Sequence, residues 1–107
     1  MKRFLSGLIV LFILSFGSIA NAGVKGTVVF ARNDVAVIQT EQFGNYTILT
    51  SCFGILSKND KVFGEFNSFG SYDFYNITKD GTFNGWVDSY WLSEQQVVDW
   101  IKFHFNL

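Results

Sequence analysis

The chain has 107 residues, of which 49% are hydrophobic and 19% aromatic, and its formal net charge at pH 7 is −1. This length suits one small domain, and the charge provides no basic surface for a phosphate backbone, so we expect no nucleic-acid partner. The single cysteine, Cys52, excludes an intramolecular disulfide, so the core must be held by packing, to which aromatic side chains contribute large areas.

The first 22 residues have the layout of a cleavable secretory signal. Two basic residues precede an apolar run over 4–19, and the small residues that a signal peptidase reads stand in the sequence ANA at 20–22. The run is shorter than the roughly 20 residues of a membrane-spanning helix. We predict a cut between Ala22 and Gly23, which leaves a periplasmic or secreted product without a stable membrane span. Loss of the two basic residues changes the net charge from −1 to −3.

Residues 23–107 are then expected to form one domain, in which short alternating runs rich in Val, Ile, Thr, Tyr and Phe predict antiparallel strands. The predicted strands cover residues 24–32, 35–41, 46–51, 61–66, 72–78 and 82–87. Asn33-Asp34 and Asp80-Gly81 favour tight hairpin turns. Gly64, within the fourth strand, indicates a bulge or a close backbone approach.

The hydrophobic period then changes to that of a helix in WLSEQQVVDWIKFHF, residues 91–105. Ser93 is the expected N-cap, and Gln96 at the third helical position completes a capping box. Leu92 and Val97 have the spacing of the hydrophobic staple that accompanies this motif. We expect the helix to cover an open end of a barrel.

The sequence LSKNDKVFGEF, residues 56–66, resembles the segment in which a turn leads into a strand in SH3-like and OB-like barrels. The predicted fold is therefore mainly β. We expect a small antiparallel barrel or curled sheet (SH3-like or OB-like) of about six strands with one C-terminal α-helix.

The chain offers few groups for catalysis. His104 is the only histidine, and we place it on or beside the buried face of the helix; a Cys52–His104 thiol enzyme ranks third among our functional hypotheses. Glu65 and Asp73 lie on adjacent predicted strands and could point to one face, although solvated acids are the favoured interpretation. We expect no enzyme activity, no cofactor and no metal.

Cys52 allows two interpretations. An odd cysteine in an exported protein is either a buried, inert thiol or the site of an intermolecular disulfide. Burial is favoured because a free cysteine packs as a small hydrophobic side chain.

Tyr75, Tyr90 and Trp91 exceed what so small a domain can bury, so we predict that they form a binding surface. The leading hypothesis is an exported, non-enzymatic domain that binds a protein through these aromatics and through an edge strand. The alternative is a small-ligand or carbohydrate binder that stacks the same rings on its ligand.

Overall fold

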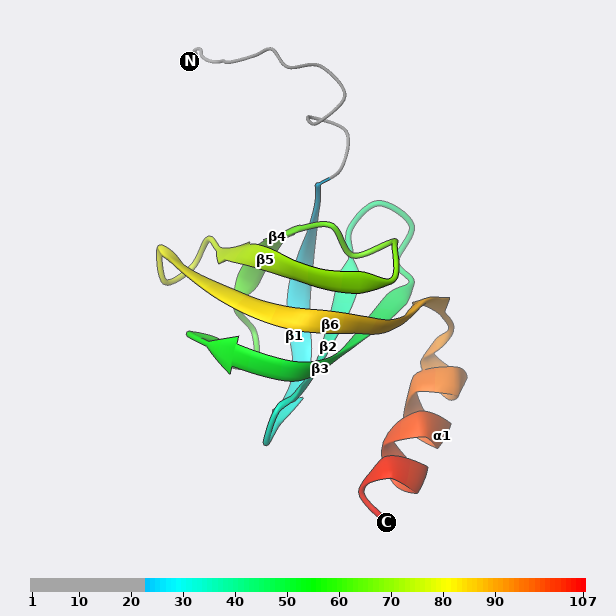
Figure 1. The fold of residues 1–107 in the computed structure, drawn as a ribbon. Helices are drawn as coiled ribbons and strands as arrows, with labels where there is room; N and C mark the ends of the chain where they lie inside the picture. Colours follow the sequence, from blue (N-terminus) through cyan, green and yellow to red (C-terminus); the bar gives the residue numbers. More distant parts are fainter. Residues whose placement is uncertain (1–22) are drawn as a thin grey trace.

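The computed structural model describes residues 23–107 (Figure 1). The predicted signal peptide, with Ala22 at its cut, lies outside the described residues. The elements in chain order are β1 (Val24–Arg32), β2 (Val35–Thr40), β3 (Tyr46–Gly54), β4 (Lys61–Gly64), β5 (Gly70–Asn76), β6 (Gly81–Leu92) and α1 (Glu94–His104).

The six strands form a closed antiparallel barrel in the order β1-β2-β3-β6-β5-β4. Two meanders, β1-β2-β3 and β4-β5-β6, are joined by the β3–β6 and β1–β4 pairs. The predicted small barrel with a C-terminal helix is confirmed. Closure gives every strand a neighbour on each side, so the expected edge strand does not occur as a free outer strand. Residues 70–74 of β5 nevertheless have no ladder partner on β4.

The two predicted hairpin turns form with the expected residues. Asn33 adopts a left-handed conformation (φ 56°) between the paired residues Arg32 and Val35. Asp80 is also left-handed (φ 51°) and precedes Gly81, which pairs with Asn76. β6 runs to Leu92, well past its predicted end at residue 87, because its second half pairs with β3.

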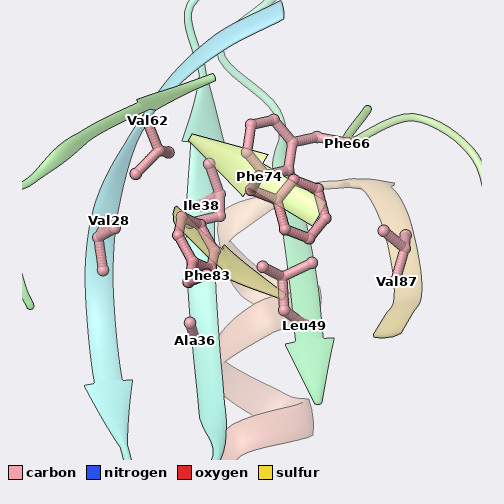
Figure 2. Packing of buried hydrophobic residues seen from close by; sticks show 9 residues of the cluster. All are labelled: Val28, Ala36, Ile38, Leu49, Val62, Phe66, Phe74, Phe83 and Val87. Carbon is pink, nitrogen blue, oxygen red and sulfur yellow. The ribbon is translucent and has the colours of Figure 1, made fainter. Parts of the chain in front are cut away.

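The barrel interior is filled by apolar side chains from all six strands and the β4–β5 connection (Figure 2). The residues are Val28, Ala36, Ile38, Leu49, Val62, Phe66, Phe74, Phe83 and Val87. The Phe74 ring stacks on Phe66 and Phe83 with centroid distances of 4.8 and 5.1 Å. A Cβ on Gly64 would collide with the Phe74 ring, so the close backbone approach predicted at this glycine is confirmed.

Helix α1 lies to one side of the barrel (Figure 1) and packs on its outer face rather than covering an open end, so this expectation is wrong. Val97 is buried against Val35 and Val37 of β2 and Ile48 of β3. The physical reason lies in β2: its alternate residues Ala36 and Ile38 fill the interior, which leaves an outward apolar row for the helix to bury.

The start of α1 agrees with its sequence signature. The Gln96 N–H donates to Ser93 Oγ at 3.2 Å, and the Ser93 N–H donates to Gln96 Oε1 at 2.8 Å. Leu92 packs against the same cluster as Val97, as the staple predicts. The capping box is confirmed.

Candidate functional site

The outer face of β4, β5 and β6 carries exposed aromatic side chains that α1 does not cover. Phe63, Tyr75 and Trp86 are 41%, 40% and 46% exposed. Phe63 pairs with Tyr75 across β4 and β5, and Trp86 lies opposite Ser71 of β5. Small polar residues lie between the rings. We call this surface the bare face; it consists of Phe63, Ser71, Asp73, Tyr75, Thr82, Asn84 and Trp86.

A hollow of about 380 Å³ opens in the bare face. Its lining residues are Gly23, Phe63, Gly64, Glu65, Asp73, Phe74, Tyr75 and Thr82. β4 and β5 pair only through Val62–Asn76 and Phe63–Tyr75, so no ladder joins the strands beside Glu65 and Asp73. Both carboxylates line this one hollow together with Phe63, Phe74 and Tyr75, which agrees with the common face that the sequence allowed for them.

Tyr75 is held in place at one wall of this hollow. Its hydroxyl donates a hydrogen bond to the carboxylate of Asp80 in the β5–β6 turn. Since this bond stabilises the protonated phenol, it raises the pKa of Tyr75. The ring therefore has a fixed direction although much of its surface is exposed.

Tyr90 and Trp91 lie elsewhere, at the far end of β6. The two rings are 5.4 Å apart, and Phe69 meets Tyr90 edge-on at 4.8 Å; we call Phe69, Tyr90 and Trp91 the Trp91 corner. Trp91 is 61% exposed and left-handed (φ 58°), a conformation that bulky residues rarely adopt. A second hollow, of about 320 Å³, lies between this end of β6, the β2–β3 turn and the start of α1.

The predicted surface of Tyr75, Tyr90 and Trp91 is thus divided between two places. Tyr75 pairs with Thr82 near the start of β6, whereas Tyr90 is eight residues further along that strand. At about 3.3 Å per residue this separation is roughly 25 Å. The structure brings Tyr90 and Trp91 together, but it does not bring Tyr75 to them.

Cys52 is a half-buried free thiol at a bulge in β3. It packs against the barrel core, and a Cβ on Gly85 of β6 would lie 3.1 Å from its Sγ. Burial, assisted by the negative charge of Asp34, raises the pKa of Cys52 to about 11. The thiolate that disulfide exchange needs is therefore scarce at neutral pH, which suits the inert interpretation better than an intermolecular disulfide.

His104 is exposed, and it lies beside the buried face of α1, as expected. Its ring stacks on Trp100 at 4.4 Å and meets Phe105 at 4.9 Å, and both of these aromatic residues pack against the cluster that contains Val97. Cys52 packs with the barrel core and His104 with the helix aromatics, so the structure does not bring these two side chains together.

Asp60, which the sequence analysis did not single out, is a buried carboxylate directly before β4. Asp60 accepts hydrogen bonds from Lys79 Nζ and Asn76 Nδ2, each at 2.7 Å, and from the Ser57 N–H at 2.9 Å. Burial alone would raise the pKa of Asp60, but these hydrogen bonds and the Lys79 charge lower it. Both carboxylate oxygens accept hydrogen bonds from within the protein, so Asp60 joins two loops rather than facing a ligand.

Within residues 23–107, no three His, Cys, Asp or Glu side chains are grouped as metal ligands would be. In the same part of the chain, α1 is too short and too polar to cross a bilayer. Comparison with protein-family models, with curated proteins and with solved structures found no match.

Proposed function

We propose that this protein is a non-enzymatic binding domain that acts in the periplasm or outside the cell and captures a macromolecular partner on its bare face. One observation carries the proposal. The barrel has two apolar outer surfaces, and α1 buries the one on β1–β3, whereas the aromatic rings of β4–β6 remain in solvent. Exposed aromatic clusters on small domains commonly mark interaction surfaces.

The chemistry of the face fits recognition rather than catalysis. Tyr75 is fixed by its hydrogen bond to Asp80, and Phe63 is its neighbour across the β4–β5 pair. Rigid aromatic side chains lose little entropy on binding and contribute large contact areas. We expect them to act as anchors for a partner.

A carbohydrate ligand is the second candidate. Small hydroxyl, amide and carboxylate side chains alternate with the rings, and Thr82 and Asn84 precede Trp86 along one face of β6. Such groups suit the hydroxyls of a sugar while the rings stack on its apolar face. In a Trp91→Phe/Trp100→Phe variant, Trp86 is the remaining tryptophan of residues 23–107, so its fluorescence can be followed alone. A fluorescence change on titration with soluble glycans favours a carbohydrate ligand over a protein partner.

Site-specific crosslinking in the native host tests the main proposal. A photoreactive phenylalanine analogue, which keeps an aromatic ring at the position, replaces Trp86 in one variant and Gln95, which is exposed on α1, in the control. We expect discrete adducts with one macromolecule from position 86 and none from position 95. Equal labelling at both positions, or none at position 86 while the protein is present, contradicts the proposal.

Export and the state of Cys52 are tested together by intact mass. The protein is isolated from its native exported fraction and weighed with and without reductant. We expect the mass of residues 23–107 in both conditions. A larger mass that falls on reduction identifies Cys52 as bonded to a partner, and a mass that includes residues 1–22 contradicts the cut after Ala22.

A further inference from the structure

We infer that the hollow between Phe63 and Tyr75 receives an arginine side chain of the macromolecular partner. This inference rests on the proposed function and adds the chemistry of the contact. The hollow has the volume of a small-ligand pocket, about 380 Å³, and it is open to solvent on a surface of adjacent strands. A side chain can therefore enter it without any movement of the barrel.

Two kinds of group line the hollow, and both favour a cation. The rings of Phe63 and Tyr75 form its aromatic walls, and a positive charge is attracted to the face of an aromatic ring. Glu65 and Asp73 add two carboxylates, whereas no lysine or arginine of residues 23–107 lines the hollow. Within residues 23–107 the single ion pair joins Lys79 to Asp60, so neither carboxylate of the hollow is paired with a base.

The combination favours guanidinium over ammonium. A guanidinium group is planar, stacks on aromatic rings and donates paired hydrogen bonds to carboxylates. An ammonium group is compact and strongly hydrated, so it gains less from flat apolar walls. Because Gly64 has no side chain, the Phe74 ring packs directly on its backbone, and apolar surface continues between the walls.

Titration with small probes tests the inference. The processed protein is purified from the exported fraction of ¹⁵N-grown cells and titrated with Nα-acetyl-arginine amide, with its lysine counterpart and with its uncharged citrulline counterpart. We expect saturable shifts of backbone amide signals at residues 63–65 and 73–75. Citrulline should bind at least tenfold more weakly than arginine, lysine should bind more weakly than arginine, and added salt should weaken the arginine complex.

Matched variants locate the charge. Glu65→Gln/Asp73→Asn should weaken arginine binding at least tenfold. Glu41→Gln, an exposed carboxylate in the β2–β3 turn, should leave the affinity unchanged. The spectrum of each variant without ligand shows whether that variant is folded. The salt dependence of arginine binding by the unmodified protein tests the role of charge without any substitution. Equal affinity for arginine and citrulline, or no effect of the double substitution, overturns the inference.

The α-amine of Gly23 is the competing occupant, since Gly23 lines the hollow and the predicted cut would free this amine. Arginine binding that appears only after the amine is acetylated would overturn the inference and assign the hollow to the chain's own terminus. Failure of the arginine titration while Trp86 still crosslinks to a partner refutes this inference alone. Absence of crosslinks from Trp86 refutes the proposed function, whatever the titration shows.

Discussion

The outer surface of β1–β3 and the bare face of β4–β6 belong to one barrel and are both rich in apolar side chains, yet they differ in what covers them. On the first surface Val35, Val37 and Ile48 are buried by Val97 of α1. On the second, Phe63 and Trp86 remain exposed. The fold therefore buries one of the two faces against its own helix and leaves the other accessible to solvent, and this is the face on which we propose that a partner binds.

The largest expected effect comes from the interior that both faces share. Phe74→Ala removes a ring that stacks on Phe66 and Phe83, and large-to-small changes at such sites cost about 3–5 kcal/mol in the free energy of unfolding. Chemical denaturation followed by tryptophan fluorescence measures the loss. A change below about 1 kcal/mol would show that the interior is not packed as described.

The covered face should respond to a charge beneath the helix. Val97→Asp places a carboxylate against Val35 and Val37, which should lower the free energy of unfolding by about 2–4 kcal/mol. The amides of α1 should then exchange with solvent hydrogen much faster, while barrel amides keep their protection. Phe103→Asp is the control, because Phe103 on the same helix is 89% exposed. Equal effects of the two substitutions would contradict the described docking of α1.

The polar cluster around Asp60 should differ from both apolar faces in its response to pH. Since folding lowers the pKa of Asp60 from its ordinary value of 3.8, its stabilisation is complete above that value and is lost as pH falls through the folded value. Asp60→Asn should lower the free energy of unfolding by about 1–3 kcal/mol at neutral pH. The same substitution should flatten the decline of stability below pH 4. An unchanged acid profile in this variant would assign the acid sensitivity to other carboxylates.

The smallest effect on stability is expected on the bare face. Trp86→Ala removes a half-exposed side chain from an uncovered surface, so the free energy of unfolding should change by less than about 1 kcal/mol. Partner capture should nevertheless be lost. A destabilisation as large as that of Phe74→Ala would show that Trp86 supports the fold, and the distinction between the two faces would fail.

Local signals in the sequence predicted much of this fold. Alternation and turn residues predicted the six strands, and Ser93 with Gln96 predicted the start of α1, because each signal acts within a few neighbouring residues. The placement of α1 depends on contacts between distant residues. The run of four apolar residues from Val35 to Ile38 indicated this placement, because a strand without polar alternation is buried on both faces and its outer face therefore needs a cover.

The candidate site was less predictable than the fold. Exposure of Tyr75 and Trp91 agrees with the sequence analysis, but their separation depends on the length of β6 and its pairing with β3. Asp60 was overlooked because a polar turn and a buried ion pair have the same local composition. Its partner Lys79 comes from a different turn and is brought to it by the pairing of β4 with β5.

Closure of the barrel also sets the pace at which the chain folds. Val24 pairs with Gly64, and Tyr46 pairs with Leu92, so both seams join segments that are distant in sequence. The entropy of closing such long loops is lost before the contacts form, and topologies of this kind typically fold in milliseconds to seconds. Such slow closure is compatible with the export that we propose for this chain, because translocation across a membrane requires an unfolded chain.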